Sequence, residues 1–266
     1  MARLALHTWS LDTTPLPDAL SAARAAGWDG VELRRLDYVR ATEMGRDAAW
    51  VADTVRANGL PVACVGVEAG WMWADGAERA RLIGVFDEQC ARAAALGCDT
   101  VMSPVDKTRG DIARAAQSVR EVGDIAAHHG VRLAIEFNSQ AEQLSSLEPM
   151  REILAKAGHA RCGLLLDSYH MQRSGVTLRA LEDVRADEIV YAQYSDVPRT
   201  GTVPGQVLDR LPPGRGSVPF KELFTLMAAK GYAGFLSYEA PNTEAWKRPA
   251  LDVAREALEA TRAVLE

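Results

Sequence analysis

The chain alternates short apolar runs with longer segments of helical periodicity, and the alternation repeats eight times in 266 residues. Short apolar runs rich in β-branched residues are typical of buried strands, whereas apolar residues spaced three and four apart are typical of helices. Repeated strand–helix units predict parallel strands covered by helices. The strand-type runs are residues 3–9, 30–34, 61–67, 100–104, 132–138, 163–168, 188–195 and 234–240.

The helical segments complete this pattern. Segments 17–27 and 47–58 run up to a Gly, which commonly ends a helix. The other segments are 78–97, 111–130, 149–158, 178–185, 220–231 and 244–266. No GxGxxG follows the first run and no GxxxxGK[ST] occurs anywhere, so the nucleotide-binding signatures of an open sheet are missing. We therefore expect residues 1–266 to form one α/β domain, a single (β/α)8 TIM barrel.

Composition narrows the class of protein. The net charge of −6 and the lack of a basic block argue against nucleic acid and membrane surfaces as partners. No stretch approaches the roughly 18 apolar residues that span a bilayer, and the N-terminal residues predict a strand rather than a signal peptide. The four cysteines lack zinc-type or CxxC spacing, which fits a reducing cytoplasm: Cys64, Cys90, Cys98 and Cys162.

Four oxygen-bearing side chains stand at the C-terminal ends of apolar runs: Glu136, Asp167, Gln193 and Glu239. In a parallel barrel these ends meet at one face, where active sites are built. Carboxylates gathered in a partly dry cleft repel one another unless a positive charge compensates them. The sequence therefore predicts a divalent cation held by these four residues.

His170 follows Asp167 by three residues in the segment DSYHMQRSG. A histidine that titrates near neutrality suits proton transfer, and this position lies within reach of whatever the cation binds. We take His170, Glu136 and Glu239 as the candidates for catalytic proton transfer.

Other residues are candidates for contacts with a substrate. Trp9 ends the first run, and aromatic walls help small-molecule clefts to exclude water. Arg199, Arg210 and Arg215 lie in the long segment after the seventh run, where a guanidinium would suit a carboxylate or phosphate and a solvent-exposed charge is the alternative. From these we select Trp9, Arg199 and Arg215.

Over essentially its whole length the chain resembles the xylose isomerase-like barrel superfamily of sugar isomerases, epimerases and dehydratases. The resemblance rests on the segments HTWS, GWDGVELR, IEFN, DSYH, QYSDVP, PPGRGSVPF and GYAGFLSYEAPN. It implies one metal ion held by Glu136, Asp167, Gln193 and Glu239, with His170 contacting substrate oxygens. Glu142 matches a substrate-contacting Glu of some epimerases in this superfamily.

Gln193 departs from the His that many sugar epimerases place at this position. The ligand set then consists of oxygens alone, which favours Mn²⁺ or Mg²⁺ over Zn²⁺, with Co²⁺ as a further candidate. Gln at this position is similar to what dehydratases acting on 3-dehydroshikimate and inosose use. The endonuclease IV branch needs several more His ligands than the five His of this chain supply.

The resemblance implies an enzyme that enolises a polyhydroxy ketone or a cyclic hydroxy-ketone. Loss of a β-hydroxyl from the enolate would give dehydration, and reprotonation would give isomerisation or epimerisation. The expected substrate is a small carbohydrate, cyclitol or cyclic keto acid. Two alternatives stay open: a deglycosidase subunit that eliminates across a 3-keto glycoside beside a small β-rich partner, and a non-catalytic sugar-binding barrel. No surface pattern selects an oligomeric state, so a homo-oligomer is compatible with the sequence.

Overall fold

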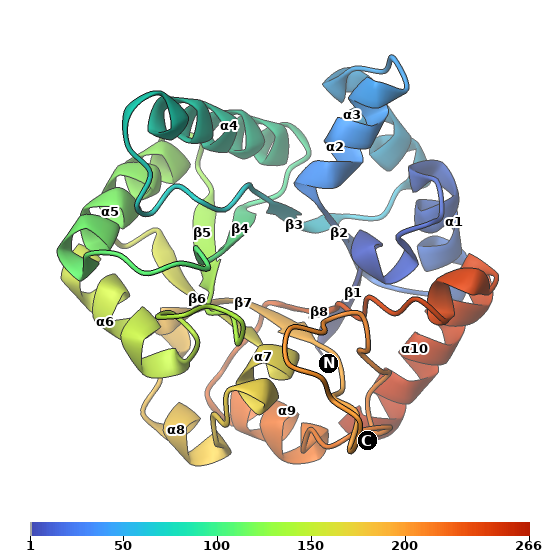
Figure 1. Ribbon diagram of the computed structural model, residues 1–266. Coiled ribbons are helices and arrows are strands. Elements are labelled where there is room, and N and C mark those ends of the chain that lie inside the picture. Colours follow the sequence, from blue (N-terminus) through green and yellow to red (C-terminus); the bar gives the residue numbers. More distant parts are fainter. Residues whose placement is uncertain (1) are drawn as a thin grey trace.

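The computed structural model describes residues 2–266, so Met1 of the expected domain lies outside the described residues. Eight parallel strands close into one barrel in sequence order, with β1 paired to β8 (Figure 1). The predicted (β/α)8 barrel is confirmed. The strands are β1 Arg3–His7, β2 Gly30–Leu33, β3 Val62–Gly66, β4 Thr100–Pro104, β5 Arg132–Glu136, β6 Cys162–Asp167, β7 Ile189–Tyr194 and β8 Phe235–Tyr238.

The predicted runs 3–9, 132–138 and 234–240 extend two residues beyond the C-terminal ends of β1, β5 and β8. The difference has a simple cause. Phe137 and Ala240 are buried although they lie past the ends of their strands, so apolar character continues where the strand ladder has ended.

Helices form a ring outside the strands (Figure 1). They are α1 Leu16–Ala26, α2 Arg35–Glu43, α3 Ala48–Asn58, α4 Gly76–Ala95, α5 Ile112–His128, α6 Leu147–Ala157, α7 Ser168–Arg173, α8 Leu178–Glu182, α9 Phe220–Ala229 and α10 Ala250–Leu265. Short 3₁₀ turns cover Thr8–Leu11, Ala186–Glu188 and Ala245–Lys247. Gly27 and Gly59 follow α1 and α3 with φ of 95° and 80°, a conformation that favours glycine, as the sequence predicted.

Three helical features differ from the sequence-based expectation. Helix α2 is largely polar and α7 has only six residues, so neither carries an extended apolar periodicity. The predicted helix 244–266 is divided, because Arg248 is extended before Pro249 and α10 begins after that proline. The steric clash that disfavours helical geometry before proline explains the break.

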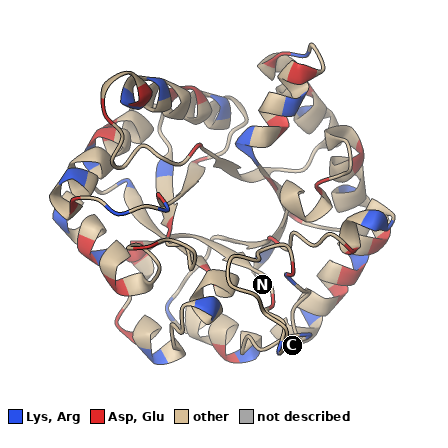
Figure 2. Cartoon of the chain, viewed as in Figure 1, with Lys and Arg blue, Asp and Glu red and all other residues tan. Residues whose placement is uncertain are grey.

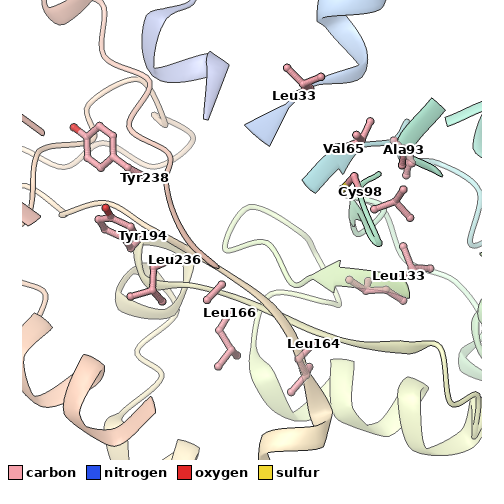
Figure 3. Packing of buried hydrophobic residues seen from close by; sticks show 14 of the residues in the cluster. Leu33, Val65, Ala93, Cys98, Leu133, Leu164, Leu166, Tyr194, Leu236 and Tyr238 are labelled. Atoms are coloured by element: carbon pink, nitrogen blue, oxygen red, sulfur yellow. The ribbon is translucent and has the colours of Figure 1, made fainter. Parts of the chain in front are cut away.

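Alternation along each strand separates two apolar layers. Leu164 and Leu166 of β6 belong to the large cluster between barrel and helices, whereas Leu165 belongs to a smaller cluster inside the barrel. Figure 3 shows outward side chains of this kind from several strands. Because strand side chains alternate between faces, Asp167 faces inward with Leu165, one step closer to the C-terminal end.

The barrel interior is therefore apolar in its middle and toward the N-terminal ends of the strands, and polar toward their C-terminal ends. The apolar part is filled by the smaller cluster: Ala5, Ala63, Cys64, Met102, Ala134, Leu165, Val190, Tyr191 and Phe235. Polar side chains follow two positions later on several strands, as with His7 after Ala5 and Glu136 after Ala134. The alternation that directs apolar side chains into the barrel interior thus also places polar side chains at the C-terminal ends of the strands.

Charged residues are scattered over the outer helices, with both signs interspersed in the view of Figure 2. This pattern agrees with the absence of a basic block in the sequence. Among residues 2–266, no helix combines the length and apolar character needed to cross a membrane.

We expect Leu164→Ala to lower the free energy of unfolding by about 2 to 5 kcal/mol, because the side chain is fully buried and its loss leaves a cavity. Leu265→Ala is the matched control. That leucine is 38% exposed at the end of α10, so the expected change is below about 0.5 kcal/mol. Urea unfolding monitored by circular dichroism measures both; equal losses would contradict the proposed division between core and surface.

Candidate active site and metal centre

Four predicted ligand residues lie at the C-terminal ends of neighbouring strands. Glu136 ends β5, Asp167 ends β6, Gln193 lies in β7, and Glu239 directly follows β8. Asp167 and Gln193 are paired in strand register, which places them side by side. All four side chains are buried. The barrel therefore brings together the oxygen donors that the sequence suggested.

Burial of these carboxyl groups raises the pKa values of two of them. Desolvation, together with the neighbouring Glu239 and Asp167, raises the pKa of Glu136 well above its usual range. Desolvation likewise raises the pKa of Glu239 to about 7, although the guanidinium of Arg210 opposes the shift. Such shifts mark a place where additional positive charge would stabilise the ionised forms.

Arg210 supplies one positive charge inside the cluster. Its Nη1 donates to Asp167 Oδ2 and to Glu239 Oε2, both at 2.8 Å, and the side chain is 2% exposed. Nη2 lies 3.3 Å from Nε2 of His170. Arg210 was not among the residues selected from the sequence, yet of the three arginines in its loop it is the one that enters the site.

Tyr169 holds Arg210 in place. The guanidinium carbon of Arg210 lies 4.3 Å from the centre of the Tyr169 ring, a cation–π contact. The Tyr169 hydroxyl lies 2.7 Å from Asp209 Oδ1 and 2.9 Å from the carbonyl oxygen of Gln206, so it donates into the loop that carries the arginine. Helix α7 therefore anchors the loop next to the site.

His170 presents one ring nitrogen to the carboxylates. Ser139 approaches Nδ1 with its backbone N–H at 3.2 Å and its hydroxyl at 2.9 Å. Nε2 consequently faces the site, 3.9 Å from Glu136 Oε1 and 3.8 Å from Asp167 Oδ2. Burial lowers the pKa of His170 to about 3 despite the nearby Asp167, which keeps the imidazole neutral near pH 7.

The residues present fit a divalent cation. Atoms of Glu136, Asp167 and His170 that can bind a metal lie within 4.8 Å of one another. Glu136 Oε1 and Gln193 Oε1 are buried and have no hydrogen-bond partner in the described part of the chain. Buried polar atoms normally have partners, so these oxygens are available as ligands. Together with Asp167 and Glu239 they form an oxygen-rich donor set, the kind that hard cations prefer.

A cavity of about 870 Å³ opens above these residues. Trp9 and Trp73 form aromatic parts of its wall, while Trp71 is buried in the core and donates from Nε1 to Ser103. Polar groups on the wall include Arg34, Lys107, Asn138 and Gln140. The size and the mixed lining suit a small polar molecule.

Three predicted substrate-binding residues lie outside this cavity's lining. The Glu142 side chain is 63% exposed and pairs with Arg109 at 3.6 Å. Arg215 pairs with Glu256 on the surface, and Arg199 is exposed. These positions give no support to a substrate contact, because none of the three side chains lines the cavity and two of them pair with other charged residues. Of the predicted substrate contacts, only Trp9 lines the cavity.

Comparisons with known proteins agree with the barrel fold. The profile described as "Xylose isomerase-like TIM barrel" matches residues 20–264. A 3-dehydroshikimate dehydratase of Pseudomonas aeruginosa is 28% identical over 89% of this chain, which spans 38% of that longer protein. An inosose isomerase of Bacillus velezensis is 23% identical, over 96% of this chain and 94% of the relative.

The fold also matches solved structures. A crystal structure of an IOLI protein with a bound zinc atom superposes with a TM-score of 0.88 at 20% identity, covering 100% of this chain and 98% of the other. At that identity the likeness concerns the fold alone.

We expect Tyr169→Phe to speed amide hydrogen exchange in residues 204–211 about fivefold, because one net hydrogen bond contributes about 1 kcal/mol to local stability. Tyr232→Phe is the matched control, since its hydroxyl donates to the Phe235 carbonyl near the opposite end of β8. Exchange in the loop should not change in that variant. Unchanged exchange in Tyr169→Phe would mean that the hydroxyl does not anchor the loop.

Proposed function

The chain belongs to the xylose isomerase-like TIM barrel family, and from this premise we propose that it is a divalent-metal-dependent enzyme that enolises a cyclic or polyhydroxy ketone. One observation carries the proposal. Glu136 Oε1 and Gln193 Oε1 are buried without a hydrogen-bond partner among the described residues, and potential ligand atoms of Asp167 and His170 lie within 4.8 Å of one on Glu136. Relatives named as dehydratases, inosose isomerases and sugar epimerases support the same class of reaction.

We assign the metal to Glu136, Asp167, Gln193 and Glu239. When bound, a divalent ion supplies electrophilic polarisation of a substrate carbonyl. The all-oxygen set supports Mn²⁺ or Mg²⁺, with Co²⁺ as a further candidate. The zinc in the IOLI structure belongs to a protein that is only 20% identical.

The chain's own groups would move the proton. The backbone N–H of Ser139 donates to Nδ1 of His170, so the neutral ring carries its proton on Nε2, which faces the site and can give that proton to a substrate oxygen. Glu136 and Glu239 are then our candidates for taking a proton from the carbon next to the ketone. Arg210 places guanidinium N–H groups beside the same carboxylates, where they can also orient substrate oxygens. Trp9 and Trp73 would limit water at the reacting centre.

Two products are possible from the same first step. Removal of the α-proton leaves its electron pair delocalised onto the carbonyl oxygen. If a hydroxyl then leaves the β-carbon and departs with a proton as water, the product is an enone. If a proton instead adds to the neighbouring carbon, or to the opposite face of the same carbon, the product is an isomer or an epimer. We favour dehydration because Gln193 and the dehydratase relative both support it, with isomerisation as the second candidate given the inosose isomerase.

We expect Glu136→Gln and Asp167→Asn each to weaken Mn²⁺ binding by more than about 100-fold, since loss of a direct ligand exceeds the 10- to 100-fold cost of an outer contact. Glu142→Gln is a matched control, because that exposed carboxyl lies in the loop after β5 and outside the cavity's lining. Mass spectrometric metal analysis after equilibrium dialysis measures occupancy. Full metal occupancy in both ligand variants would contradict the assignment of Glu136 and Asp167 as metal ligands.

We expect the Mn²⁺-loaded protein to convert 3-dehydroshikimate or an inosose into an ultraviolet-absorbing enone, with keto-sugars as the third group to screen. His170→Asn should slow this turnover by about 100- to 10,000-fold, the usual contribution of general acid–base catalysis. Isomer formation without absorbance, followed by chromatography, would select the second candidate. Wild-type turnover retained in His170→Asn would exclude His170 as the proton carrier.

A further inference from the structure

Glu32 is a buried carboxyl group inside the barrel that the proposed chemistry does not use. It lies in β2 and is 0% exposed. We propose that Glu32 is a positioning residue, which holds the amide of Gln193 so that the amide oxygen faces the metal centre. The inference rests on the proposed metal-dependent function and adds a reason why a glutamine can serve at that position.

The contact crosses the barrel interior. Strands β2 and β7 are separated by β1 and β8 in the closed sheet, yet Gln193 Nε2 donates to Glu32 Oε1 at 2.8 Å. Tyr191, two residues earlier on the same face of β7, donates its hydroxyl to Glu32 Oε2 at 3.1 Å. Each carboxyl oxygen of Glu32 thus accepts a hydrogen bond from β7.

This arrangement determines which end of the Gln193 amide faces which neighbour. Oε1 of Glu32 accepts the hydrogen bond, so it selects the NH₂ end of the amide. The carbonyl end must then point the other way, and Gln193 Oε1 is indeed buried with no hydrogen-bond partner within residues 2–266. Rotating the amide would set two oxygens against each other and turn NH₂ toward the cation site.

His7 limits the freedom of the same carboxyl group. Its Nδ1 accepts the backbone N–H of Trp9 at 3.0 Å, which leaves Nε2 directed at two acids. Nε2 lies 3.5 Å from Glu32 Oε1 and 3.3 Å from Glu239 Oε1. Glu32 therefore contacts side chains of both β1 and β7. These contacts fix the position of its carboxyl group, which can then orient the amide of Gln193.

The test is a double-mutant cycle of Mn²⁺ affinity, followed by the electron paramagnetic resonance of free Mn²⁺. In the wild-type background, Glu32→Gln should weaken binding about 10- to 100-fold, because an amide at position 32 accepts Gln193 in either orientation. In the Gln193→Met background, where no amide needs orienting, the same change should alter affinity less than about threefold. A purely electrostatic or structural role for Glu32 predicts equal losses in both backgrounds.

The outcomes separate this inference from the proposed function. If the wild-type protein binds no Mn²⁺, the metal centre and this inference both fail. If the wild type binds Mn²⁺ and Glu32→Gln binds it equally well, or the losses are equal in both backgrounds, only the role of Glu32 is overturned.

A measurement on the unaltered chain tests the hydrogen bond between Gln193 and Glu32, on which the proposal depends, whether or not the variants fold. The side-chain amide protons of Gln193 should exchange with solvent at least about 100-fold more slowly than those of the exposed Gln117, because hydrogen-bonded buried protons exchange only when the structure opens. Comparably fast exchange at both glutamines would overturn the proposal.

Discussion

Carboxyl groups buried at one end of a barrel require positive charge close by, and this requirement organises the site. Glu136, Asp167 and Glu239 are buried together, and the charge of Asp167 raises the pKa values of both Glu136 and Glu239. Arg210 meets part of the demand through two hydrogen bonds of 2.8 Å. The proposed divalent ion would supply the remaining positive charge. Compensation of the buried carboxyl groups therefore involves the barrel, the loop that carries Arg210 and the proposed chemistry together.

The loop that carries Arg210 is directed inward from its base. Asp196 follows β7, is fully buried, and accepts N–H bonds from Val197, Gly216 and Val218. Its backbone also pairs with Leu211 in an isolated antiparallel bridge. The carboxyl group of Asp196 therefore binds both ends of the loop between Val197 and Val218. The chain between them must form a compact loop, and its arginine reaches the barrel mouth.

Local patterns were sufficient to predict much of this molecule. The eight strands follow from the alternation of apolar runs with helical segments, and Glu136, Asp167, Gln193 and Glu239 were placed at one face because each stands at the C-terminal end of such a run. Glu32 was not selected from the sequence, since nothing local indicated that it would contact β7 across the interior. Such a contact depends on closure of the barrel, which joins residues 161 positions apart.

Loop side chains were harder to predict, and the arginines after β7 illustrate the reason. Arg215 was selected as a candidate substrate contact from its place in the long segment after the seventh run, yet it pairs with Glu256 of α10. Arg210 has no distinguishing neighbours in the sequence, and the bonds at Asp196 and Tyr169 bring it inward. These bonds form between segments far apart in the chain, so no short window of sequence contains them.

Side chains on the outward face of each strand pack against the helices and stabilise the fold, whereas side chains on the inward face form the candidate site. Leu164 and Leu166 pack outward against helices, while Asp167 on the same strand faces the mouth. A substitution at the mouth therefore leaves the packing layer intact, and selection can alter the reaction without rebuilding the protein. Gln193 illustrates this freedom. A lineage of such barrels can diverge into dehydratases, isomerases and epimerases while its architecture persists at 20–28% identity.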